Sequence, residues 1–115
     1  MRTLGFWAWT AGAAAVSTLL RVRFWFTPLT PDEAGTSVAA QGWAQGQGLY
    51  TDLFIDRPQG LLVLYQRWEA LVGPGDTAVR MLGTLAAIVL VVATGMAGRT
   101  LARSTTAGAV AAVFV

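Results

Sequence analysis

The stretch from Met81 to Gly98 contains no charged residue and is rich in Leu, Val, Ile and Ala. Arg80 and Arg99 bound it on its two sides. A helix of about 18 or more apolar residues is long enough to cross the hydrocarbon core of a bilayer. Charged residues make up only 12 % of the chain, about half the ~25 % of a soluble domain. The sequence therefore predicts a membrane chain and excludes intrinsic disorder, a coiled coil and a typical soluble domain.

A second uncharged run extends from Leu4 to Leu20. With Arg21 and Arg23 snorkelling towards the headgroups, the span can extend to Phe26. Arg2 in front of an apolar run is also typical of a secretory signal peptide. Arginines and bulky aromatic residues, however, follow where a small-residue cleavage site would end such a peptide. We therefore expect an uncleaved first transmembrane helix.

A third apolar run, from Ala107 to Val115, is too short to span a bilayer. Because a chain rarely ends at mid-membrane depth, we expect the N-terminal piece of a longer multi-pass protein. The predicted fold is all-α: two transmembrane helices plus the start of a third, with short interfacial helices in the intervening extracytoplasmic loop. The predicted segments are a first transmembrane helix at 1–26, a loop at 27–76, a second transmembrane helix at 77–98, a second loop at 99–106 and a truncated third helix at 107–115.

The loop at 99–106 carries two Arg and no acidic residue, which favours the cytoplasmic side. The N-terminus is then cytoplasmic, the loop at 27–76 is extracytoplasmic, and the protein lies in the cytoplasmic membrane. The sequence pI is about 9.9, but the basic residues are scattered rather than clustered into a stripe. Nucleic-acid binding is therefore not expected, and the predicted partner is the lipid bilayer.

All six acidic residues lie in the 27–76 loop. Pro28 and Pro31 end the first helix, and Thr30 or Asp32 can cap a new one that runs to about Gln45. A second helix is predicted from Leu61 onwards, where apolar residues recur at helical spacing. Both helices are too polar or too short to cross the bilayer, so we expect them at the membrane surface.

The chain has no Cys and no His, so its chemistry has to come from Asp, Glu, Arg, Ser, Thr or Tyr. Asp32 and Glu33 adjoin the end of the first span. One interpretation is structural: an N-cap and an acid that matches the helix dipole. The other is functional, because a carboxylate can take a proton from an acceptor hydroxyl and paired acids can hold a divalent cation.

Asp56-Arg57-Pro58 has the same two interpretations. The acid can simply pair with the neighbouring arginine, or Arg57 can bind an anionic ligand, because guanidinium matches phosphate oxygens. Asp56 would then serve a metal or a sugar hydroxyl. Five aromatic residues of the loop suit interfacial anchoring or, less commonly, sugar stacking: Trp43, Tyr50, Phe54, Tyr65 and Trp68.

The order of these motifs resembles the start of the C-type superfamily of integral-membrane glycosyltransferases. The closest likeness is to the branch of protein O-mannosyltransferases and lipid A aminoarabinose transferases. Asp32-Glu33 matches the family's Asp-Glu pair, and Leu49–Asp52 matches its aromatic stretch. Asp56–Gly60 resembles its "D-x-K-P-P-G" element, with Arg in place of Lys and Gln59 in place of the second Pro. The sequence around Arg80 resembles the family's "a-l-R-l" start of the following span.

The resemblance implies an enzyme that transfers a sugar from a polyprenyl-phosphate donor to an extracytoplasmic acceptor. Asp32 would be the catalytic base, with Glu33 beside it to orient it or to support a metal. Asp56 would help to bind a divalent metal ion, and Arg57 would hold the lipid phosphate. The family has many spans, so these 115 residues are expected to be inactive alone.

Two alternatives come from other functional classes. In a small non-enzymatic membrane subunit or anchor protein, the same acids would be solvated loop residues. A coupled transporter is expected to carry an ionisable residue within a span, and neither predicted span does.

Overall fold

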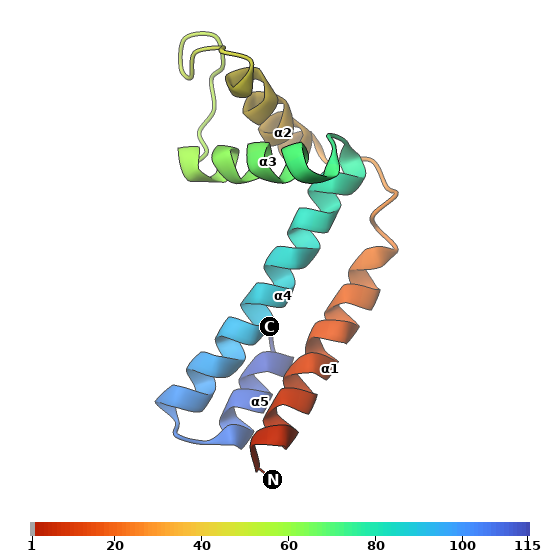
Figure 1. The fold of residues 1–115 in the computed structure, drawn as a ribbon, viewed down its shortest axis with the longest axis vertical. Coiled ribbons are helices and arrows are strands. Elements are labelled where there is room, and N and C mark those ends of the chain that lie inside the picture. The colour runs from red at the N-terminus through yellow and green to blue at the C-terminus, as the bar shows by residue number, and fades with distance from the viewer. Residues whose placement is uncertain (1) are drawn as a thin grey trace. The chain divides into compact units, whose positions relative to one another are not determined.

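The computed structural model describes residues 2–115, with side chains from Leu4 onwards. The described part of the chain is all-helical and contains no β-strand, which confirms the all-α prediction. Its helices are α1 (Arg2–Val22), α2 (Pro31–Ala44), α3 (Gln59–Val72), α4 (Asp76–Leu101) and α5 (Thr105–Val113), as Figure 1 shows. The helix of the predicted first span ends at Val22, and residues 23–26 form turns.

Two compact units make up the chain. The first, called the helical unit here, combines residues up to Arg23 with Gly83–Val115. The second, called the loop unit, is Phe24–Leu82. The loop unit therefore contains α2, α3 and the first residues of α4, and all six acidic residues belong to it.

Among the described residues, α4 is the one helix that is both long and apolar enough to cross a membrane. Its sequence starts with Asp76 in the first turn and has Arg99 in the last, charges that match the helix dipole. Apolar side chains such as Val89 and Leu90 are exposed along it, as expected of a surface that faces lipid tails rather than water. The structure thus contains one helix with the length and apolarity of a membrane span, at the position that the sequence predicts.

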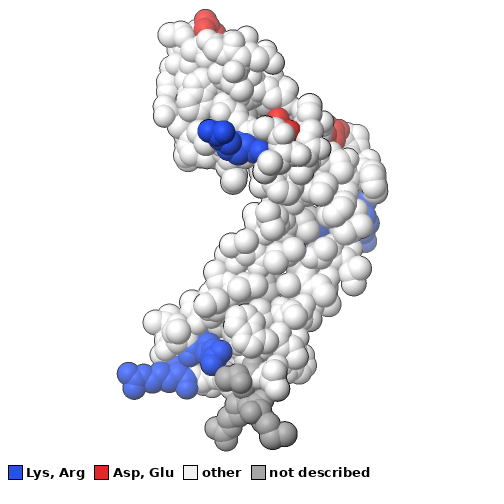
Figure 2. Space-filling model, viewed as in Figure 1, with Lys and Arg blue, Asp and Glu red and all other residues white. Residues whose placement is uncertain are grey.

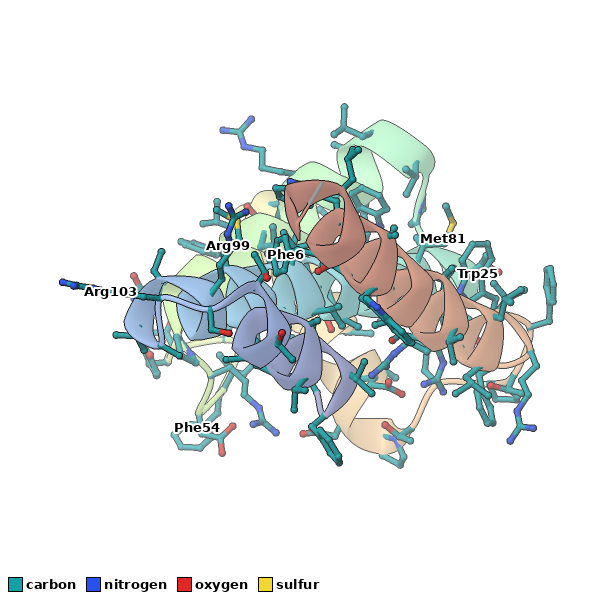
Figure 3. All side chains as sticks on the ribbon, turned by 90° about the horizontal axis from the view of Figure 1, so that it is seen from below. Phe6, Trp25, Phe54, Met81, Arg99 and Arg103 are labelled. Atoms are coloured by element: carbon teal, nitrogen blue, oxygen red, sulfur yellow. The ribbon has the colours of Figure 1, made fainter. Side chains whose placement is uncertain are left out.

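Small residues let α5 pack closely in the helical unit, where it lies beside α1 (Figure 1). A Cβ atom at Gly98 would be 2.9 Å from the Ala111 Cβ, and one at Gly108 would be 2.7 Å from the Gly95 carbonyl oxygen. The ring of Phe6 is fully buried here, and the Arg99 guanidinium lies 5.1 Å from the ring centroid, as Figure 3 shows. This contact is a cation–π interaction between α1 and the end of α4.

Figure 2 shows basic side chains gathered where α4 ends and α5 begins. Arg103 adopts a φ of +49° in this turn. The Ser104 side chain then accepts a hydrogen bond from the Ala107 N–H and caps α5.

In the loop unit, α2 and α3 pack against each other around a small apolar cluster of Ala39, Ala40, Ile55 and Leu62. A buried polar contact joins the same helices. The carboxylate of Glu69, 6 % exposed, accepts hydrogen bonds from Ser37 Oγ at 2.6 Å and Gln41 Nε2 at 2.9 Å. Because a buried carboxylate needs such donors, these bonds favour one alignment of α2 against α3.

Both helices predicted within the 27–76 loop are present. α2 starts at Pro31 and α3 at Gln59, each within about two residues of its expected start. The indole Nε1–H of Trp68 donates to the Ala78 carbonyl at 2.7 Å and so ties α3 to the first turns of α4.

Candidate functional site at the start of α2

The start of α2 is fixed by a complete capping box. Thr30 Oγ1 accepts from the Glu33 N–H at 3.4 Å, and Glu33 Oε2 accepts from the Thr30 N–H at 2.9 Å. Pro31 occupies the first helical position, where a missing N–H does no harm. Of the two caps that the sequence allowed, the structure uses Thr30. Asp32 and Glu33 consequently lie in the first turn of the helix, where the dipole favours negative charge.

The second oxygen of Glu33 binds an arginine from α4. Arg80 Nη1 donates to Glu33 Oε1 at 2.8 Å, and Arg80 Nη2 donates to the Pro28 carbonyl at 2.9 Å. Burial acts to raise the pKa of Glu33, but the Thr30 hydrogen bonds and the Arg80 charge outweigh it, so the pKa is lowered from its ordinary 4.5. Glu33 is therefore an ionised carboxylate with donors on both of its oxygens.

Asp32 has a different partner. Its carboxylate accepts a hydrogen bond from Arg57 Nη2, although the two residues are 25 positions apart. Arg57 Nε also lies 3.6 Å from Asp56 Oδ1. The hydrogen bond that Arg57 donates to Asp32 and the charges of both acids raise the pKa of Arg57 above its ordinary value. Arg57 thus forms the pair with Asp56 that its neighbourhood suggests, and a closer one with Asp32.

A groove of about 380 Å³ opens beside this ion pair. One wall comes from the first turns of α2 and the other from the segment that leads to α3. Its lining residues are Pro31, Asp32, Gly35, Thr36, Ala39, Phe54, Ile55, Asp56 and Arg57. The volume lies within the range of about 300–1,000 Å³ that is usual for small-molecule pockets. The groove combines two carboxylates, one guanidinium and one aromatic ring, so it can accept hydroxyl protons and hold an anion at adjacent points.

The predicted metal ligands Glu33 and Asp56 both have partners within the protein. Among the described residues, no three acidic side chains lie together. Both oxygens of Glu33 already accept hydrogen bonds from Thr30 and Arg80, and Asp56 faces Arg57. The divalent metal therefore stays a prediction, and no step below depends on it.

The Leu49–Asp52 stretch, the remaining motif of the family resemblance, has a local structural role. The Gly48 N–H donates to Asp52 Oδ2 at 2.8 Å, so Asp52 closes the turn that contains Tyr50. Tyr50 has a φ of +70° in this turn. Asp52 therefore stabilises the turn from which the backbone continues to Phe54 and Arg57.

Two contributions to the site were not predicted. The sequence singled out Arg80 only as the border of a span, whereas in the structure it holds Glu33 across 47 positions. Glu69 carried no signal at all, because it looked like a polar residue of a surface helix. Its burial depends on where α2 packs, which no local pattern encodes.

Comparisons with family models, curated proteins and solved structures find no match.

Proposed function

We propose that this chain is the N-terminal portion of a membrane glycosyltransferase that moves a sugar from a polyprenyl-phosphate donor to an extracytoplasmic acceptor. The observation that carries the proposal is the contact between Asp32 and Arg57 at the edge of a groove. A candidate base, Asp32, and an anion-binding group, Arg57, are therefore in direct contact. The same unit contains the start of α4, the helix that is long enough to span a membrane, which suits a substrate held in the lipid.

The reaction requires two charge movements. Asp32 accepts the proton of an acceptor hydroxyl, whose oxygen forms a bond to the anomeric carbon of the sugar. The bond from that carbon to the phosphate oxygen breaks, and the lipid phosphate leaves with the electron pair. Arg57 stabilises the negative charge on the departing phosphate through its planar pair of N–H donors.

The ion pair links these two roles. A phosphate offers several charged oxygens to a guanidinium, so the phosphate of a bound polyprenyl-phosphate sugar competes with Asp32 for Arg57. When Arg57 exchanges Asp32 for the phosphate as its partner, Asp32 loses its closest cation. Asp32 then accepts a proton more readily. On this basis, donor binding activates the base.

Glu33 and Arg80 position the base in this proposal. Glu33 is held by the capping box and by Arg80, which fixes the first turn of α2 and with it Asp32. The finer membrane arrangement is also part of the proposal. α1, with 21 residues and a length of about 30 Å, serves as the first span, and α5 begins the third. The Arg-containing turn after α4 is then cytoplasmic and the loop unit extracytoplasmic, in the cytoplasmic membrane.

The test is sugar transfer in membranes that contain the protein at its native length, with a panel of radiolabelled polyprenyl-phosphate sugars. Asp32→Asn keeps the size of the side chain but removes its basicity, so transfer should fall by about 100-fold or more. Asp76 is an exposed acid in the first turn of α4, so Asp76→Asn is the matched control and should retain activity. Near-normal transfer by the Asp32 variant would falsify the assignment of the base.

The size of the native protein separates this function from that of a small membrane subunit. An antibody against the segment 33–56 should detect a band several times larger than 12.1 kDa in membranes of the source organism. A band at 12.1 kDa itself would favour the non-enzymatic subunit or anchor.

A further inference from the structure

The aromatic residues of the loop unit have different surroundings. Trp43 and Tyr65 pack against the apolar cluster between α2 and α3, and Trp68 donates its indole N–H to Ala78. Tyr50 lies in the turn closed by Asp52. Phe54 differs from these four, because its side chain is 91 % exposed and it lines the groove beside Asp32 and Arg57.

Figure 3 shows the Phe54 ring standing clear of the helices. Because the ring is exposed and lines the groove, a ligand bound there can cover it and gain stabilisation from burying its apolar face. The opposite wall of the groove leaves room for a ligand. At Gly35 on that wall, an added Cβ would meet no atom within 4 Å.

We propose that Phe54 is the platform on which the sugar ring of the donor stacks. This inference rests on the proposed function, because it places the sugar next to a phosphate held by Arg57. A pyranose ring has one face of C–H groups and an edge of hydroxyls. The Phe54 ring covers the C–H face of the sugar. The carboxylates of Asp32 and Asp56, which line the same groove, accept hydrogen bonds from the sugar hydroxyls.

The spacing along the chain suits this ligand. Phe54 and Arg57 are three residues apart, at most about 10 Å along the backbone, and both line the groove. The phosphate of such a donor is attached directly to the ring, so one short ligand reaches both side chains.

The other occupant of an exposed aromatic ring near a membrane is the bilayer itself. Insertion of Phe54 would bring Asp56 and Arg57 towards the hydrocarbon, and Asp56 is 81 % exposed. Moving charged groups into hydrocarbon costs free energy. Phe26 offers a contrast, because it is 83 % exposed, is the last residue of the first predicted span and does not line the groove. The charges around Phe54 thus favour a polar ligand over lipid.

The test compares two probes with the protein at its native length in nanodiscs: polyprenyl phosphate without a sugar, and the same lipid carrying the hexose or pentose that gives the strongest binding. Dissociation constants are measured for the wild type and for Phe54→Ala, Phe54→Trp and Phe26→Ala. Phe54→Ala should weaken binding of the sugar-bearing lipid by about fivefold and leave binding of the bare phosphate unchanged. Phe54→Trp should restore the tighter binding of the sugar-bearing lipid over the bare phosphate. Phe26→Ala, the matched control, should keep this difference.

The possible failures are distinguishable. If the wild type binds bare and sugar-bearing lipid equally, the stacking proposal is overturned while the phosphate site at Arg57 stands. Equal weakening of both probes by Phe54→Ala would make the ring a membrane anchor and also overturn it. If neither lipid binds to the wild type, the proposed function itself fails.

Discussion

Arg80 and Glu33 are 47 residues apart and form a 2.8 Å ion pair between α4 and the first turn of α2. The same arginine holds the Pro28 carbonyl, so it binds both the helix start and the segment that precedes it. Both side chains are less than one-third exposed, which limits screening by solvent. The pair therefore links the first turns of α4 to the turn that carries Asp32.

A double-mutant cycle should measure this link. Arg80→Met and Glu33→Gln are each expected to lower the free energy of unfolding of the loop unit by about 1–3 kcal/mol, because each leaves a partly buried partner unpaired. The double variant should cost less than the sum of the two, with a coupling energy of about 1 kcal/mol. Urea unfolding in detergent, followed by tryptophan fluorescence, gives these values. Strictly additive effects would show that the pair adds no stability.

The stability of the loop unit should depend on pH through Glu33. Since the pKa of Glu33 is lower in the folded state than its ordinary value of 4.5, the unfolded chain binds its proton more readily. The stabilisation is therefore fully present above pH 4.5 and is lost as the pH falls through the lower folded-state pKa. Unfolding curves between pH 6 and pH 3 should show this loss in the wild type and a smaller one in Glu33→Gln. Parallel pH profiles of the two proteins would contradict the assignment.

The cap of α2 gives a prediction that is independent of charge. Thr30→Ala removes the side-chain oxygen that accepts from Glu33 N–H and should cost about 1 kcal/mol. Thr30→Ser keeps a hydroxyl at the same place and should restore most of the loss. Hydrogen exchange of the first amides of α2 is the direct measurement, with protection lost in the first variant and recovered in the second.

Arg57 should tolerate replacement by lysine only in part. Lys keeps the positive charge but not the planar pair of N–H donors. On the proposed function, Arg57→Lys should therefore raise the KM for the lipid-linked sugar donor by about tenfold, with a smaller change in kcat. Arg57→Met, which also removes the charge, should be more severe in both constants. If the lysine variant matched the wild type, a bidentate contact with phosphate would be ruled out.

Close packing in the helical unit predicts that replacement of glycine by alanine destabilises the protein at one position and does not at another. Gly108→Ala brings a methyl group to 2.7 Å from both Arg99 Cβ and the Gly95 oxygen, so it should destabilise by about 1–3 kcal/mol. Gly12→Ala meets no atom within 4 Å and should be neutral or stabilising, because alanine favours a helix. Thermal unfolding in detergent compares the two, and equal effects would argue against the contact between α4 and α5.

Local chemistry accounts for the elements that were predictable from the sequence. The uncharged run after Arg80 has the length and apolarity of α4, and Thr30, Pro31 and Glu33 have the spacing of a capping box. Each of these features depends on residues within about one turn of one another or on a single continuous run. Their positions can therefore be derived without knowledge of the rest of the molecule.

The partners of the charged residues were decided by tertiary structure. From the sequence, Asp56 was the natural partner of Arg57 because it is its neighbour, yet the hydrogen bond from Arg57 goes to Asp32. That choice follows from the packing of α2 on α3, which Ser37, Gln41 and Glu69 align. The alignment brings the start of α2 next to the segment before α3. An ion pair needs its charges to be close in space, and only the packed helices bring residues so distant in sequence together.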